Sequence, residues 1–173
     1  MKPSFYFCTP DTYLCLNFIK MDKKKKEGRY GRLLTQLEEL TAKPGNELSR
    51  MSTIAAVLHH KMDYFFWTGF YLLENDRLIV GPYQGPVACQ ELERGKGVCW
   101  AAVTRDSAVI VPDVTQFPGH ISCDSRSRSE ITLPVKDKNG NLRAILDIDS
   151  ATENMFDEVD EQYLNTIINL IYN

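Results

Sequence analysis

The sequence predicts an α+β fold in which helices pack against a central antiparallel sheet. Three observations support this prediction: leucines recur at helical spacing, aromatic and β-branched residues occur in hairpin-like pairs of segments, and the last segment is amphipathic. Strands joined by short turns run antiparallel, so the hairpins determine the type of sheet. A chain of 173 residues, 43% hydrophobic and 25% charged, suits one domain with a single core.

The expected elements are two helices, a hairpin, a third helix, a short strand, a second hairpin and a last helix. Leucine spacing predicts a helix at 30–42, which the sequence KPG ends. Asn46 is a suitable N-cap for a second helix that ends near Met62. The first hairpin is expected in YFFWTGFYLL with RLIVGPY, and the third helix in GKGVCWAAVTRD. The short strand is expected in AVIVPD, the second hairpin in EITLPVKDKNGNLRAILDID and the last helix in FDEVDEQYLNTIINLIY.

Residues 1–28 are expected to form an arm outside the fold, so that the domain spans residues 29–173. Pro10 and Asp11 interrupt the apolar patches of the arm and no small-residue cleavage site follows, which argues against a secretory signal. The run KKKK that ends at residue 26 is typical of a solvated segment. Met21 precedes that run and would itself make a suitable chain start.

Composition argues against several classes of partner. The formal net charge of −3 disfavours nucleic acid, which requires a basic face. No apolar run approaches the roughly 20 residues of a membrane span, so no membrane association is expected. The five cysteines include no CxxC pair, so no metal site is expected. Their low density favours a reducing compartment and a cytoplasmic location.

The last hairpin is expected to gather carboxylates on one face. Asn139 and Gly140 are expected as the two central turn residues. The residue numbers of every facing pair in the hairpin then add up to the same total. Glu130 then lies opposite Asp149, with Asp147 on the diagonal. The other face becomes apolar and consists of Ile131, Leu133, Val135, Ala144, Leu146 and Ile148. Opposed like charges destabilise a sheet by up to about 1 kcal/mol, so folding alone would not select them.

Two interpretations of the carboxylates stay open on this pattern. They would lie on a solvent-facing surface with arginines between them, the candidates being Arg126, Arg128 and Arg143. Alternatively they would line a pocket that receives a cation and keeps one carboxyl protonated, because crowded carboxylates cannot all ionise. Trp67, Gly69 and Tyr71 share one face of the first strand and would either wall this pocket or pack in an ordinary core. The opposite face would hold Phe66, Phe70 and Leu72.

The motifs WTGFYLL, GPYQGPVAC, GKGVC, GHISCDSRSRSEI and LDIDS occur in this order. Together they resemble the free methionine-(R)-sulfoxide reductases, which are single GAF domains, over about residues 30–172. The resemblance implies a GAF-like fold and reduction of free L-methionine (R)-sulfoxide to L-methionine. It also implies thioredoxin as the electron donor, no metal or organic cofactor, and a tendency to form homodimers. A GAF-like fold alone would be weak support, because that fold mostly serves as a binding module.

The resemblance also assigns roles to individual residues. Cys123 matches the catalytic cysteine, and its place in a polar loop suits a thiolate that a substrate must reach. Cys89 and Cys99 match the two assisting cysteines, and Cys89 is favoured as the one that resolves the sulfenic acid. The substrate pocket is expected to contain Trp67, Tyr71, Glu130, Asp147 and Asp149. Thr68 and Trp100 depart from the family pattern, which puts the shape of the pocket in question.

Two other functions stay open on the sequence. A GAF domain without catalytic activity would sense a small molecule or the cellular redox state, although no second domain to receive the signal is expected. A thiol hydrolase would use Cys123 with His120 as its base. Neither a third orienting residue nor an oxyanion motif is evident for such a hydrolase.

Overall fold

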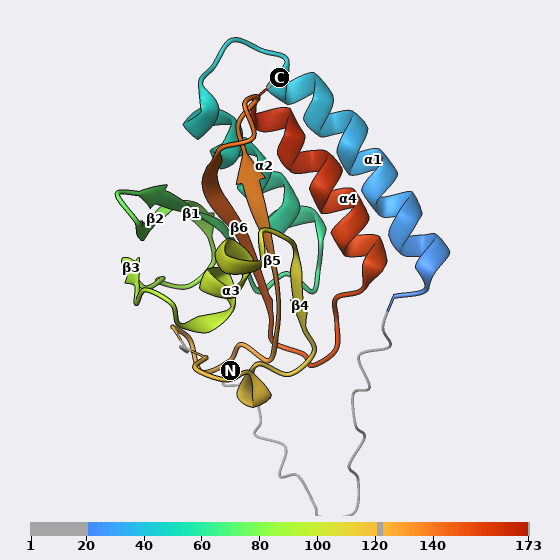
Figure 1. The fold of residues 1–173 in the computed structure, drawn as a ribbon. Helices are drawn as coiled ribbons and strands as arrows, with labels where there is room; N and C mark the ends of the chain where they lie inside the picture. The colour runs from blue at the N-terminus through green and yellow to red at the C-terminus, as the bar shows by residue number, and fades with distance from the viewer. Residues whose placement is uncertain (1–20, 121–122, 173) are drawn as a thin grey trace, which may run out of the picture.

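The computed structural model describes residues 21–120 and 123–172, which build a six-stranded antiparallel sheet with helices on both faces (Figure 1). The strand order is β3-β2-β1-β6-β5-β4. The strands are β1 (Trp67–Glu74), β2 (Arg77–Gln84), β3 (Glu91–Leu92), β4 (Val109–Val111), β5 (Ser129–Lys136) and β6 (Leu142–Ser150). The helices are α1 (Lys23–Thr41), α2 (Glu47–Lys61), α3 (Gly97–Arg105) and α4 (Glu158–Ile168), with short 3-10 turns at Val114–Gln116 and Asn169–Ile171.

The two faces of the sheet have different roles. On one face α2 packs on β1 and β2 and α4 packs on β5, and α1 packs on those two helices (Figure 1). The six apolar residues predicted for this side of the last hairpin are all buried there, which confirms that prediction. The opposite face is covered by α3, whose buried side chains meet Trp67 and Tyr71. The α+β fold class is therefore confirmed.

The helix ends follow the capping chemistry of the sequence. Asn46 caps α2, because its Oδ1 accepts a hydrogen bond from the Ser49 backbone N–H at 2.9 Å. The Ser49 hydroxyl accepts in return from the Asn46 N–H at 3.0 Å. Asp157 and Asp160 form the same reciprocal arrangement at the start of α4. Among the described helices, none is long and apolar enough to cross a membrane.

The turn of the last hairpin differs from the prediction, whereas its register does not. Asp137 pairs with Asn141 and accepts a hydrogen bond from the Gly140 N–H at 2.9 Å, so the loop has three residues and not two. Gly140 adopts φ 81°, as the last residue of such a loop requires. A register shift between Val135 and Lys136 then restores the predicted pairing of Glu130 with Asp149.

The boundary expected at residue 28 was wrong, because α1 begins at Lys23. Lys26 is 1% exposed, so the lysine run is not uniformly solvated. Its Nζ donates to Asp160 Oδ2 at 2.6 Å and to Asp157 Oδ2 at 2.9 Å, which joins α1 to the start of α4. Tyr30 and Tyr64 donate hydroxyl hydrogen bonds to the other oxygen of Asp160. The first 20 residues of the predicted arm lie outside the described residues.

This buried ion pair predicts unequal effects for two neighbouring lysines. Lys26→Met removes the cation and leaves Asp160 buried, which costs about 3 kcal/mol or more of unfolding free energy. Lys24→Met alters an exposed side chain of the same helix and changes stability by less than about 0.5 kcal/mol. Urea unfolding of the two variants tests this, and equal midpoints would show that the Lys26 contacts do not hold α1 in place.

Candidate active site

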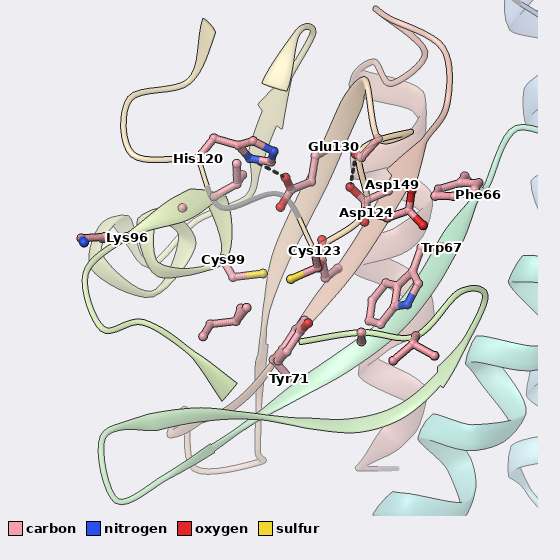
Figure 2. A pocket seen from close by; sticks show the side chains of 17 residues that line it. Phe66, Trp67, Tyr71, Lys96, Cys99, His120, Cys123, Asp124, Glu130 and Asp149 are labelled. Atoms are coloured by element: carbon pink, nitrogen blue, oxygen red, sulfur yellow. Dashed lines mark hydrogen bonds and ion pairs between the residues drawn. The ribbon is translucent and has the colours of Figure 1, made fainter. Parts of the chain in front are cut away.

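Three carboxyl groups of β5 and β6 line a pocket on the face of the sheet that α3 covers (Figure 2). Glu130 on β5 pairs directly with Asp149 on β6, and Thr132 pairs with Asp147. Glu130 is 6% exposed and Asp147 is 7% exposed. The interpretation as a solvent-facing acidic surface is therefore wrong. The pocket side of the sheet was correctly predicted because period-2 alternation fixes which side chains share a face.

Burial raises the pKa of each of these carboxyls. The pKa values of Glu130 and Asp147 lie well above their ordinary range, chiefly through desolvation and then through repulsion by neighbouring carboxylates. Desolvation raises the pKa of Asp149 to about 6, and a hydrogen bond from the Ser127 hydroxyl opposes that rise. Burial therefore favours a retained proton on the Glu130–Asp147 pair more strongly than on Asp149.

Two aromatic side chains of β1 form a wall beside these carboxyls. The rings of Trp67 and Tyr71 are stacked with centroids 5.8 Å apart. Gly69 lies between them, and a Cβ there would come within 2.5 Å of the Trp67 ring and 2.4 Å of Tyr83 Cβ. Only glycine lets the indole lie across the strand at this point. The Tyr71 hydroxyl donates to the backbone carbonyl of Cys89 at 3.3 Å, which ties the wall to the cysteine loop.

The cysteines predicted to react are brought together at this pocket. Cys89 and Cys123 form a disulfide across 34 residues of sequence, with Cα atoms 5.6 Å apart. Cys123 is exposed at the rim, as its polar loop predicted. Cys99 on α3 is a free thiol, 3% exposed, and burial raises its pKa. In the view of Figure 2, Cys123 lies between Cys99 and Trp67.

His120 lies against the acidic cluster. Its Nδ1 is 3.9 Å from Glu130 Oε2, and burial lowers the pKa of the imidazole (Figure 2). A neutral imidazole at this distance is a neighbour of the carboxyl and forms no strong ion pair with it. Within residues 21–120 and 123–172, the ionic contact of His120 is with Glu130, and a base role toward Cys123 stays a prediction.

Several pocket residues were not predicted from the sequence. Phe66 lines the pocket and not the apolar core face, because it precedes β1 and strand alternation does not extend to it. The Arg126 guanidinium lies 4.7 Å from the centre of the Phe66 ring and also pairs with Asp124, so both residues shape the rim. Thr68 and Trp100 do not line the pocket.

The raised pKa of Glu130 predicts a dependence of stability on pH. The folded protein keeps this proton to a higher pH than the unfolded chain, so the unfolding free energy falls as pH rises from about 4 through the raised pKa. Glu130→Gln removes that contribution. As the pH is raised above the ordinary range of a glutamate, its melting temperature should therefore fall less than that of the wild type.

Glu39→Gln, an exposed substitution on α1, is the matched control and should keep the wild-type slope. Melting temperatures of the three proteins across the pH range test this prediction. Parallel curves for the wild type and Glu130→Gln would show that Glu130 is ionised in the folded state at neutral pH.

Comparisons with known proteins agree with this geometry. A family model described as GAF domain matches residues 52–172. GAF domain-containing protein A of Dictyostelium discoideum is 43% identical to the chain, over 90% of this chain and 98% of that protein. The free methionine-R-sulfoxide reductase of Escherichia coli (strain K12) is 40% identical, over 80% of this chain and 84% of that protein.

A solved structure shows the same relationship. The free methionine-R-sulfoxide reductase of Neisseria meningitidis, in complex with its substrate, matches with a TM-score of 0.81 at 36% identity. That match covers 87% of this chain and 90% of the other. The sequence motifs and the fold thus lead to the same group, and the chain belongs to the free methionine-R-sulfoxide reductase family of GAF domains.

Proposed function

We propose that this protein reduces free L-methionine (R)-sulfoxide to L-methionine and is recycled by thioredoxin. The observation that carries this proposal is a proton-holding carboxyl pair, Glu130 and Asp147, in the same pocket as the Cys89–Cys123 disulfide. Sulfoxide reduction by a thiol needs both an acid and a second thiol. The Escherichia coli and Neisseria relatives, whose names state this activity, support the assignment.

In the first step the Cys123 thiolate attacks the sulfoxide sulfur. A protonated carboxyl of the Glu130–Asp147 pair delivers a proton to the sulfoxide oxygen, which weakens the S–O bond as it breaks. The transient bond between the Cys123 sulfur and the substrate sulfur then breaks and leaves its electron pair on the substrate sulfur, while the oxygen ends on Cys123 as a sulfenic acid. The products are free methionine and oxidised Cys123, which balances the reaction.

In the second step Cys89 captures the sulfenic acid. Its thiol displaces water from Cys123 and forms the disulfide that the structure contains. A dithiol protein such as thioredoxin then reopens this bond by thiol exchange and leaves in its own disulfide form. The exposed position of Cys123 gives an external thiol access to the bond. Cys99 is assigned an assisting role, because it is too buried to meet a partner protein directly.

Substrate selection follows from the walls of the pocket. Asp149, with a pKa of about 6, is ionised at neutral pH and would hold the substrate ammonium. Trp67 and Tyr71 would contact the apolar part of the side chain. A methionine sulfoxide within a polypeptide lacks that ammonium and would have to pass its backbone through these walls. Homodimer formation and a cytoplasmic location stay predictions.

Epimer selectivity tests the proposed substrate. The purified protein with thioredoxin and its reductase should consume free methionine (R)-sulfoxide and leave the (S) epimer and peptide-bound sulfoxide nearly untouched. We expect the acid pair, which lies on one face of the sheet, to reach only one placement of the sulfoxide oxygen. Coupled nicotinamide oxidation measures the rates, and equal rates on both epimers would refute the assignment. No turnover of any sulfoxide would favour a sensing role.

Single-turnover chemistry separates the roles of the two bonded cysteines. Pre-reduced Cys123→Ser should release no methionine, because the attacking sulfur is missing. Pre-reduced Cys89→Ser should release about one equivalent and then stop, because the sulfenic acid has no partner thiol. Quantifying methionine after mixing with substrate in the absence of reductant tests both outcomes. Methionine release by Cys123→Ser would identify another cysteine as the nucleophile.

A further inference from the structure

We propose that Cys99, Glu130 and Asp147 form a Zn²⁺ site in the floor of the pocket, and that bound Zn²⁺ inhibits the enzyme. One ligand atom from each residue, the Cys99 sulfur and a carboxylate oxygen of each acid, lies within 4.8 Å of the other two. The three side chains come from α3, β5 and β6. Sequence spacing gave no sign of this group, because its members are brought together only by the sheet.

The donor set and spacing suit zinc. Tetrahedral Zn²⁺ holds sulfur at about 2.3 Å and oxygen at about 2.0–2.2 Å, which places ligand atoms roughly 3.3–3.8 Å apart. Small side-chain rotations would bring the three atoms from their present spacing to that distance. A thiolate beside carboxylates favours Zn²⁺ over Mg²⁺ or Ca²⁺, which prefer oxygen ligands alone. Three protein ligands leave the fourth position open for water.

An unsatisfied oxygen in the same place points independently to a cation. Asp147 is 7% exposed and lines the pocket, and its Oδ1 has no hydrogen-bond partner among the described residues. The same carboxyl forms side-chain hydrogen bonds with Glu130 and Cys99. A divalent ion bound to all three groups would also satisfy the unpaired Oδ1. The same ion would offset the repulsion between the two acids.

The surroundings can admit and support the ion. The cavity measures about 60 Å³ and reaches the exposed rim at Cys123, so an ion with water ligands can enter. His120 Nδ1 lies 3.9 Å from Glu130 Oε2, at the edge of the ligand group. Cys89 and Cys123 are bonded to each other, so neither provides a ligand in this form.

The inhibitory effect rests on the proposed function, whereas the metal site does not. Zn²⁺ on Glu130 and Asp147 would occupy the two carboxyl groups that the proposed reduction uses. Binding can be measured on the disulfide form, which performs no turnover. Failure of the metal site and failure of the reductase assignment are therefore distinguishable.

Cobalt binding to the disulfide form tests the site. In a Cys8→Ser/Cys15→Ser background, Cys99 is the one remaining thiol, so a thiolate-to-cobalt charge-transfer band can come only from it. Titration with CoCl₂ should give that band with one equivalent bound, and ZnCl₂ should abolish it. Adding Cys99→Ser should eliminate the band. Glu130→Gln and Asp147→Asn should each weaken Zn²⁺ binding at least tenfold, and Glu39→Gln should leave it unchanged.

Melting curves of each variant show whether it is folded. The metal site would be overturned if the protein formed no 1:1 complex with Co²⁺, or formed one without the thiolate band. The inhibition is tested with pre-reduced protein freed of reductant, where stoichiometric ZnCl₂ should slow single-turnover methionine release at least tenfold. Unchanged release from protein with Zn²⁺ bound would overturn the inhibitory role while leaving the reductase assignment intact.

Discussion

The pairing of Glu130 with Asp149 across β5 and β6 constrains the rest of the structure. Two acids directly opposite each other on a covered face oppose folding, because both desolvation and repulsion disfavour their charged forms. The protein tolerates this arrangement by keeping a proton within the cluster. That retained proton is also the reagent that reduction of a sulfoxide needs, so the cost to stability and the proposed chemistry have one origin.

The remainder of the fold offsets this cost on the far side of the sheet. The apolar faces of β5 and β6 are buried under α2 and α4, while the acids face α3. The buried Lys26–Asp160 contact then fixes α1 against α4, away from the pocket. Stability and chemistry thus occupy opposite faces of one sheet, so pocket residues can be selected for reactivity. Gly69 is a further example, because glycine is unfavourable in a strand but leaves space for the Trp67 ring on the pocket face.

Much of this could be predicted from the sequence because alternation in strands is a strong rule. The acidic face, the apolar face and the facing pair of Glu130 and Asp149 all follow from period 2 and a nearly correct turn. The turn itself was predicted one residue too short, and a bulge near Val135 compensated for the difference. That agreement in register was partly fortunate, because a bulge in a strand has no reliable sequence signal.

The features that were missed depend on contacts distant in sequence. Lys26 looks like one of four solvated lysines until α4 places Asp160 beside it. Phe66 and Ser127 lie just outside regular strands, where alternation gives no direction for a side chain. The grouping of Cys99 with Glu130 and Asp147 requires a helix and two strands to meet. None of these has a local motif that could have indicated it.

The central claim is that the buried acid pair supplies the proton for sulfoxide reduction. Turnover of free methionine (R)-sulfoxide by Glu130→Gln, with its melting temperature measured on the same preparation, tests that claim most directly. The account predicts a rate on the order of 100-fold or more below wild type, the usual scale for a lost general acid, with a melting temperature unchanged or raised. A folded Glu130→Gln protein that turns over at nearly the wild-type rate would contradict it.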